Sequence, residues 1–142
     1  MEFIEFSVDS EEYKKALILR RKILREPLKL DISPEDLSTE KDQLHFGLFN
    51  DNEIKACVIA VPMNDGIAKV RQMAVRPELQ NQGLGSKLLL LCMADLKQKG
   101  FRKVELNARK TAVDFYKKYG FQICSDEFIE VTIPHFKMFR DL

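Results

Sequence analysis

Apolar and polar residues recur over residues 3–25 in patterns that predict one strand and one helix. A partly alternating run, Phe3–Val8, predicts the strand. Asp9 followed by Glu12 resembles a capping box, which opens an amphipathic helix from Ser10 to about Arg25. Pro27 stops this helix because proline has no backbone N–H to donate within a helix interior.

Three strands in antiparallel order are predicted next. Leu44–Phe49 and Ile54–Pro62 are apolar runs joined by Asn50–Glu53, whose composition is typical of a hairpin turn. A second turn, Asn64–Gly66, leads into a strand over Ile67–Val75.

A polar segment, Pro27–Asp42, separates the first helix from these strands, and a short helical turn is expected at Pro34–Leu37. Long connections in compact domains often have a function. The segment is therefore either a cover over a substrate site or a plain surface excursion.

The second half begins with a helix that is apolar on nearly all sides, Leu84–Lys99, which ends at Gly100. The strand Lys103–Asn107 follows. A strand–helix–strand unit of this size predicts a right-handed crossover between parallel strands.

Another helix is expected before Gly120, followed by two terminal strands with a break at Pro134. The residues at helical spacing are Ala108, Ala112, Phe115, Tyr116 and Tyr119. The terminal strands are predicted over Phe121–Cys124 and Phe128–Phe139.

These elements predict a mixed α/β (α+β) fold. Its central sheet should hold about six to seven strands, antiparallel in the N-terminal part and parallel in the middle pair, flanked by about four helices. Residues 1–142 are expected to form a single domain, because the length suits one core and the chain contains no linker or repeat.

Composition narrows the function classes. With 23 basic and 22 acidic residues the net charge is +1, which argues against general binding to nucleic acid or membranes. Arg109-Lys110 and Lys117-Lys118 are either local basic patches or solvated helix surface. The longest apolar run, Leu88–Ala94, is too short to span a membrane, and the acidic N-terminus has no signal core. A soluble, cytoplasmic protein is expected.

Three cysteines, Cys57, Cys92 and Cys124, are odd in number and share no metal-ligand spacing. Each lies in an apolar run, so all three are predicted to be buried, reduced thiols, and no metal site is expected.

The most distinctive motif is Gln80–Gly85, a glycine-containing turn between a strand and a helix. Such a junction presents several backbone N–H groups at the positive end of the helix dipole, where phosphate oxygens bind. The two glycines allow unusual backbone angles and close approach of a ligand. The alternative is an ordinary loop that contains two glycines.

Two common phosphate loops do not fit. The chain has no Gly-x-x-x-x-Gly-Lys-Ser/Thr string. The dinucleotide fingerprint fits at Gly83 and Gly85 but has Leu88 at its third glycine position. Glu105 falls about twenty positions after the motif, yet it lies inside a predicted strand rather than near its end.

The order of these motifs resembles the GNAT superfamily of acyl-CoA N-acyltransferases. The residues that carry the resemblance are Met73–Pro77, Gln80–Gly85, Asn107 and Ala112–Phe121. The close resemblance covers about half of the chain, from Ile67 to Phe121.

The resemblance implies acetyl-CoA, or a related acyl-CoA, as the cofactor. Its pantetheine arm would pair with the backbone of Met73, Ala74 and Val75. The pyrophosphate would lie on the turn formed by Gln80, Asn81, Gln82, Gly83, Leu84, Gly85 and Ser86, with Lys87 either adding charge or pointing into water. Asn107 would line the wedge for the thioester, cap the following helix, or both.

The resemblance also assigns Tyr116 as the general acid that protonates the leaving thiolate; the alternative is an aromatic core residue. An alkyl amine has a pKa of about 10.4, so a base or a water chain would help to deprotonate it. The base is expected to be His135 or Glu105, and Glu130 and His45 are further candidates.

The sequence therefore predicts an acetyl-CoA-dependent N-acetyltransferase that moves the acetyl group by direct attack in a ternary complex. The acceptor would be a small-molecule or peptide amine, and a homodimer is left open. A catalytically silent acyl-CoA-binding sensor is the alternative.

Overall fold

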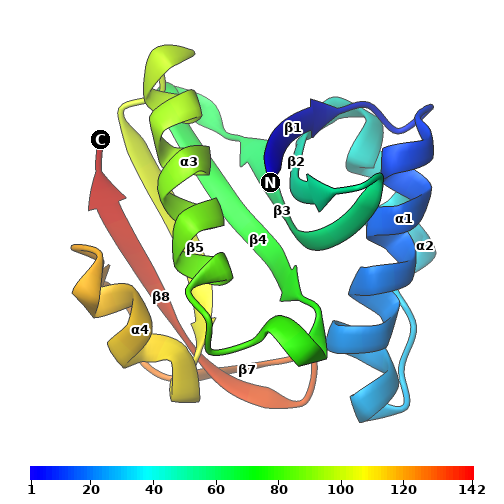
Figure 1. Cartoon of the computed structure of the whole chain (residues 1–142). Helices are drawn as coiled ribbons and strands as arrows, with labels where there is room; N and C mark the ends of the chain where they lie inside the picture. The colour runs from blue at the N-terminus through cyan, green and yellow to red at the C-terminus, as the bar shows by residue number, and fades with distance from the viewer.

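The computed structural model describes all 142 residues as a mixed sheet with helices on both faces (Figure 1). The eight strands follow the order β1-β2-β3-β4-β5-β8-β6, and β7 also pairs with β8. The strands are β1 (Glu2–Phe6), β2 (Leu44–Asn50), β3 (Glu53–Pro62), β4 (Ile67–Val75), β5 (Lys103–Arg109), β6 (Gln122–Ile123), β7 (Phe128–Glu130) and β8 (Ile133–Asp141). The helices are α1 (Glu11–Arg20), α2 (Pro34–Thr39), α3 (Leu84–Gln98) and α4 (Val113–Lys118).

The predicted fold class is confirmed. Strands β1 to β4 are antiparallel neighbours, and β4 and β5 form the parallel pair that α3 connects. The antiparallel β8 then pairs with β5. The short strands β6 and β7 share the other edge of β8.

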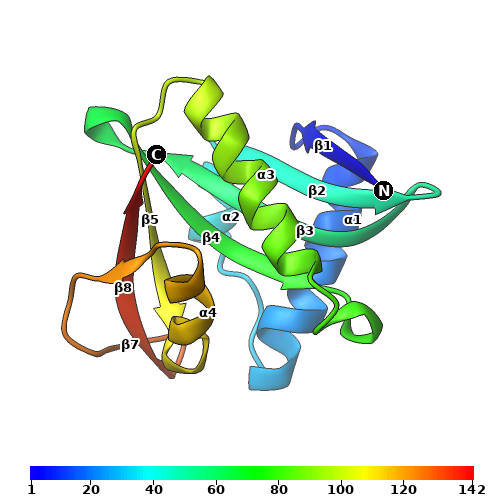
Figure 2. The same cartoon turned by 60° about the vertical axis from the view of Figure 1, so that its left-hand side comes forward.

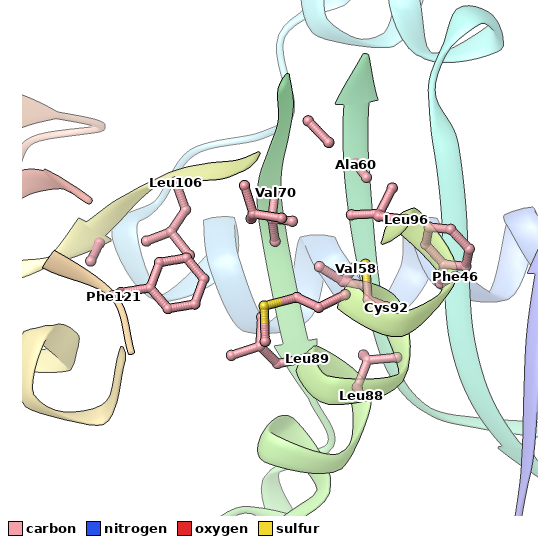
Figure 3. Packing of buried hydrophobic residues seen from close by; sticks show 14 of the residues in the cluster. Phe46, Val58, Ala60, Val70, Leu88, Leu89, Cys92, Leu96, Leu106 and Phe121 are labelled. Carbon is pink, nitrogen blue, oxygen red and sulfur yellow. The ribbon is translucent and has the colours of Figure 1, made fainter. Parts of the chain in front are cut away.

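Two apolar clusters hold the helices against the sheet. The larger one contains 18 buried residues and fills the space between α3 and the sheet (Figure 3). It includes Phe46, Val58, Val70, Leu88, Leu89, Cys92, Leu96 and Leu106. The smaller one packs α1 on the opposite face, around Tyr13, Ala16, Leu19, Phe49 and Cys57. Each face of the sheet therefore has its own helical cover (Figure 2).

The start of α1 differs from the prediction. Ser10, and not Asp9, is the N-cap: its side chain accepts a hydrogen bond from the backbone N–H of Tyr13 at 3.1 Å. The helical run does continue to Arg25, because a π-helical turn over Arg21–Arg25 follows α1. The short helix in the following segment is also present, extended to Thr39 as α2.

The predicted boundary at Ala108 is wrong. Strand β5 continues to Arg109, and Ala108 is a buried strand residue opposite Phe136. Helix α4 begins only at Val113, so Asn107 cannot be its N-cap. Pairing with β8 over the whole length of β5 outweighs the helical spacing of the side chains.

The terminal strands are divided at a different place than predicted. Pro134 lies within β8, opposite Ile129 of the short strand β7. The chain reverses instead at Val131-Thr132, both with positive φ (49° and 64°), as a two-residue hairpin turn requires.

Cys124 is exposed, which corrects the prediction that all three thiols are buried. It follows the two-residue edge strand β6, whose residues are exposed as well. Separately, no helix combines the length and the apolar character needed to cross a membrane.

The packing of α3 gives a stability prediction. Leu88 is fully buried beneath the helix, whereas Leu90 is 46% exposed. Leu88→Ala should lower the free energy of unfolding by about 2–5 kcal/mol, because it leaves a cavity. Leu90→Ala should change it by less than about 1 kcal/mol. Urea denaturation followed by circular dichroism measures both, and equal losses would contradict this orientation of α3.

Candidate active site

The parallel strands β4 and β5 separate part-way along their length (Figure 2). Their pairing begins at Ile67–Lys103 and ends at Val70–Leu106, although β4 continues to Val75 and β5 to Arg109. The edge of β4 that faces β5 therefore has no strand partner from Arg71 onward.

A bulge in β4 accompanies this separation. Gln72 has φ +54°, and the register with β3 shifts between the Arg71–Ile59 and Ala74–Cys57 pairs. The extra residue shifts the alternation of side chains along β4. Val70 lies in the cluster beneath α3, and Met73, three positions later instead of two or four, packs against the same cluster. The bulge thus turns the outer end of β4 and leaves its backbone open.

A cleft of about 910 Å³ occupies the space between the two strands. Its walls bring together most of the predicted cofactor residues: Met73, Val75, Gln80, Asn81, Gly83, Leu84, Gly85, Ser86, Asn107 and Tyr116. Three predicted residues do not line it. Ala74 is buried against α1, Gln82 is exposed, and Lys87 is exposed on α3.

The glycine turn leaves the N-terminus of α3 open toward this cleft. Gly83, the N-cap residue, has φ +81° and no side chain that could cap the helix. The first backbone hydrogen bond of the helix is donated by the N–H of Lys87 to the Gly83 carbonyl, at 3.0 Å. The amides of Leu84 to Ser86 therefore have no backbone carbonyl partner. Such a terminus binds anions.

Two glutamine side chains fasten the turn by hydrogen bonds to backbone carbonyls. The side-chain amide of Gln80 donates to the Val75 carbonyl, and that of Gln82 donates to the Glu78 carbonyl, both at 3.1 Å. The predicted role of this turn consequently depends on its backbone.

Tyr116 reaches the cleft from α4 and is partly buried. Its ring packs edge-on against Phe115 and Phe121, with centroids 5.0 and 5.7 Å away. Burial raises the pKa of Tyr116, and the positive charge of Arg109 opposes this effect. The phenol therefore keeps its proton at neutral pH, as a proton donor must.

The four base candidates separate clearly in space. His135 and Glu130 line the cleft, whereas Glu105 and His45 do not. Glu105 lies 3.5 Å from Lys137 in an ion pair. His45 is buried, with Nε2 2.7 Å from the Glu40 carbonyl.

His135 is held in one orientation. Its Nδ1 lies 2.7 Å from the Ile133 carbonyl, so Nδ1 carries the donated proton and Nε2 is free to accept one. The carboxylate of Glu130 instead accepts a hydrogen bond from the Asn107 side chain at 2.8 Å.

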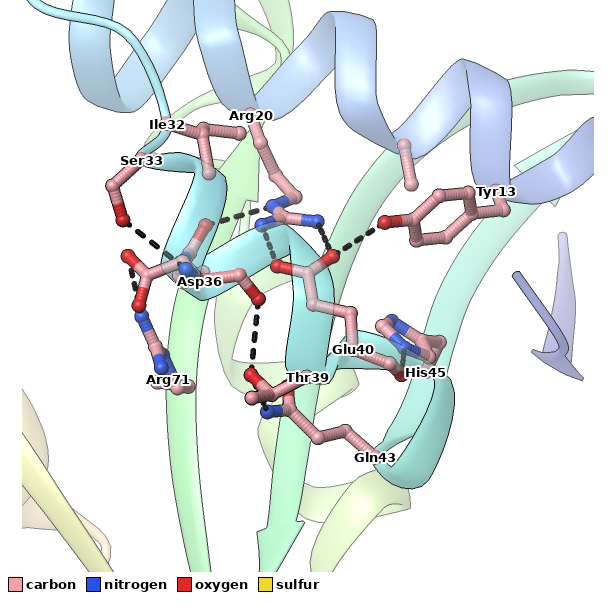
Figure 4. A network of polar contacts seen from close by, with 12 residues as sticks. Tyr13, Arg20, Ile32, Ser33, Asp36, Thr39, Glu40, Gln43, His45 and Arg71 are labelled. Atoms are coloured by element: carbon pink, nitrogen blue, oxygen red, sulfur yellow. Dashed lines mark hydrogen bonds and ion pairs between the residues drawn. The ribbon is translucent and has the colours of Figure 1, made fainter.

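A buried polar network that the sequence analysis missed supports the cleft (Figure 4). Arg20 of α1 donates two hydrogen bonds to Glu40, at 2.8 and 2.5 Å, and a third from Nε to Gln72 Oε1 at 2.8 Å. The Tyr13 hydroxyl donates to Glu40 at 2.6 Å. The available signal was the position of Arg20, which shares a helical stripe with Tyr13 and Ala16.

The segment Pro27–Asp42 is therefore partly buried and not a plain surface excursion. Glu40 near its end is 1% exposed, and Asp36 in α2 lines the cleft. No group of three or more His, Cys, Asp or Glu side chains is placed to hold a metal ion.

Comparison with known proteins identifies the family. The model of the acetyltransferase (GNAT) domain matches residues 10–142. The chain belongs to the GNAT family of N-acetyltransferases. Among its relatives, the uncharacterized N-acetyltransferase YjcF of Bacillus subtilis is 29% identical over 137 residues, which cover 94% of this chain and 95% of the relative.

Solved GNAT structures share the fold. An acyl-CoA N-acyltransferase from Pseudomonas aeruginosa superposes with a TM-score of 0.86 at 20% identity, covering 98% of each chain. A GNAT acetyltransferase from Elizabethkingia anophelis, solved with acetyl-CoA bound, superposes with a TM-score of 0.76 at 19% identity and covers 99% of this chain and 97% of its own.

The buried network should make this GNAT protein sensitive to acid. Burial lowers the pKa of His45, against the opposing effect of its hydrogen bond to the Glu40 carbonyl. Burial disfavours the charged form of Glu40, but hydrogen bonds from Arg20 and Tyr13 outweigh it and lower that pKa too. In both cases the unfolded chain binds the proton first.

Stability should therefore be fully present above about pH 6.5, the ordinary pKa of histidine, and be lost as the pH falls below it. We expect the urea midpoint to drop between about pH 6.5 and about pH 5, and His45→Gln to flatten the upper part of this drop. A wild-type midpoint that rises on acidification would contradict the prediction.

Proposed function

We propose that this GNAT enzyme transfers an acetyl group from acetyl-CoA to a primary amine by direct attack within a ternary complex. The observation that carries the proposal is the separation of β4 from β5 beside the uncapped N-terminus of α3. One opening thus combines an anion-binding terminus, an unpaired strand edge and a proton donor. We also propose that residues 1–142 act as one domain.

The residues present fit the cofactor. The free amides of Leu84, Gly85 and Ser86 would hold the pyrophosphate, and the edge of β4 at Met73–Val75, which has no partner strand, would pair with the amides of the pantetheine arm. Bound acetyl-CoA would supply an acetyl group activated as a thioester. The structural relative from Elizabethkingia anophelis, which holds acetyl-CoA, supports this proposal.

The chain's own residues would divide the proton transfers. The Tyr116 hydroxyl would give its proton to the thiolate sulfur that leaves when the acetyl group passes to the amine nitrogen. Nε2 of His135 would accept the proton that the amine loses, directly or through water. A backbone N–H of β4 would donate to the carbonyl oxygen as negative charge develops on it.

Direct attack also agrees with the state of the thiols. Burial raises the pKa of both Cys57 and Cys92 to about 12, so neither forms a thiolate readily at neutral pH. Cys124 does not line the cleft. An acyl-cysteine step has no suitable nucleophile in this arrangement.

Tyr116→Phe tests the proton donor. The substitution should lower kcat by about 10²-fold or more, because it removes the hydroxyl and keeps the packing. Tyr119→Phe is the matched control: Tyr119 is on the same helix, packs against Phe115 and does not line the cleft, so its activity should be unchanged. Thiol release from acetyl-CoA with a panel of amines measures both. An unchanged kcat in Tyr116→Phe would reject this role.

Gly85→Ala tests the cofactor site apart from chemistry. A Cβ at Gly85 would meet only ordinary contacts, 3.7 Å from Met73 Sδ and 3.8 Å from Val75 Cγ2, so the fold should persist. The methyl group would occupy space over the helix N-terminus and should weaken CoA binding by about tenfold. Calorimetric titration with CoA measures this, and Leu90→Ala on the exposed side of α3 is the control.

Two results would contradict the cofactor and enzyme proposals. Unchanged CoA affinity in Gly85→Ala would place the cofactor elsewhere. Saturable CoA binding by the wild-type protein, without thiol release for any amine, would indicate a binding module and not an enzyme.

A further inference from the structure

One wall of the cleft, on the face of the sheet that α1 and α2 cover, carries more positive than negative side chains. Six charged residues line the cleft, and the four cations among them outnumber the two carboxylates. The cations are Arg25, Lys69, Arg71 and Arg109; the carboxylates are Asp36 and Glu130. This surplus contrasts with the nearly balanced charge of the whole chain.

This region lies apart from the N-terminus of α3. Ala68 and Val70 of β4 and Ala108 of β5 belong to the cluster beneath α3. Because side chains alternate along a strand, Lys69, Arg71 and Arg109 project from the opposite face. The cationic surplus is therefore not part of the turn proposed to hold the pyrophosphate.

Both carboxylates already have partners. Asp36 of α2 forms an ion pair with Arg71 at 3.4 Å (Figure 4), and Glu130 accepts a hydrogen bond from Asn107. No carboxylate lies within 4.0 Å of the other cations, Arg25, Lys69 and Arg109. The protein supplies too few anions for this wall.

Arg25 shows the imbalance most clearly. Arg25 is only 9% exposed. Its guanidinium donates a single hydrogen bond, from Nη1 to the carbonyl of the adjacent Leu24 at 3.2 Å. Its other guanidinium nitrogens make no hydrogen bond, and they are not sealed in the interior. They are therefore accessible from the cleft, which Arg25 lines. A buried cation without a counterion is costly, and a bound anion would remove that cost.

The electrostatics agree with this geometry. Burial lowers the pKa of Arg25; Asp36 opposes that effect, while the positive charges of Arg20, Arg71 and Arg109 reinforce it. Gln72 lies beside them with its Oε1 held by Arg20, but its Nε2 is sealed in the interior and adds no accessible donor. The wall therefore offers several donors and positive charges without matching acceptors.

We propose that this wall binds an oxyanion carried by the acceptor, so that the acceptor is an amine that also bears a carboxylate or phosphate group. Arg25 and Arg109 would contact the oxyanion and determine specificity, with Lys69 adding charge. The inference rests on the proposed acetyl transfer and names the class of its acceptor.

Matched pairs of amines test the proposal. The pairs are glycine with glycinamide, β-alanine with its amide, and phosphoethanolamine with ethanolamine. Acetyl transfer is measured as thiol release, and its rate is divided by the concentration of unprotonated amine so that amines of different pKa can be compared. Binding of each amine is measured separately by calorimetry without acetyl-CoA. The anionic member should have a kcat/KM at least about tenfold higher, because only it pairs with the buried guanidinium. The two kinds of pair distinguish carboxylate from phosphate.

Variants connect this preference to the wall. Arg25→Gln should abolish the anionic preference, and Arg109→Gln, at a partly exposed site, should reduce it without a risk to folding. Arg21→Gln is the control, since Arg21 lies on the same π-helical turn, pairs with Asp31 and does not line the cleft. The ratio within each pair cancels any general loss of activity.

The possible failures are distinguishable. Neutral amines acetylated as fast as their anionic partners would overturn the inference and leave acetyl transfer intact. A preference that survives both Arg25→Gln and Arg109→Gln would also overturn it. Anionic amines that bind through Arg25 without any acetyl transfer would overturn the proposed function, and with it the assignment of the anion to an acceptor.

Discussion

The buried ion pair between Arg20 and Glu40 is the constraint on which the cleft depends. It joins α1 to the end of the α2 segment, and through Arg20 Nε it reaches Gln72 in the bulge of β4. Removing either charge would leave the other unpaired in the interior, at a cost of about 3–5 kcal/mol. The same contacts fix the residue with φ +54° at which β4 turns from β5. Stability and the opening of the cleft therefore both involve this set of hydrogen bonds.

The opening divides the work between the two faces of the sheet. On the α3 face, uncapped amides and a raised tyrosine pKa suit an acidic cofactor and a leaving thiolate. On the α1 face, an excess of cations faces the space where an acceptor would enter. Because the cleft runs between β4 and β5, reactants bound on opposite faces could meet without either crossing the core. This arrangement favours a ternary complex over a covalent relay through the enzyme.

Local patterns predicted much of the fold, and the errors have physical causes. The hairpin β2–β3, the helix α3 and the parallel pair β4–β5 follow from turn residues, apolar runs and crossover handedness. The prediction of a helix at Ala108 failed because pairing with β8 extends β5. The predicted break at Pro134 failed because β7 is a short edge strand, where proline is tolerated. The prediction that Cys124 is buried failed because its apolar run lies at an exposed edge strand.

The sequence by itself determined the glycine turn, the order of strands around it and the family that they indicate, because these depend on residues close together in the chain. Only the tertiary structure decided which of the candidate bases reaches the cleft, because Glu105 lies where β5 is still paired with β4, whereas His135 lies opposite Arg109 at the separated end of β5. Arg25, Arg71 and Arg109 likewise come from three distant segments and appear in the sequence as ordinary surface charges. Their meeting in one cleft, with only Arg71 paired to a carboxylate, arises when the π-helical turn after α1, β4 and β5 are brought together.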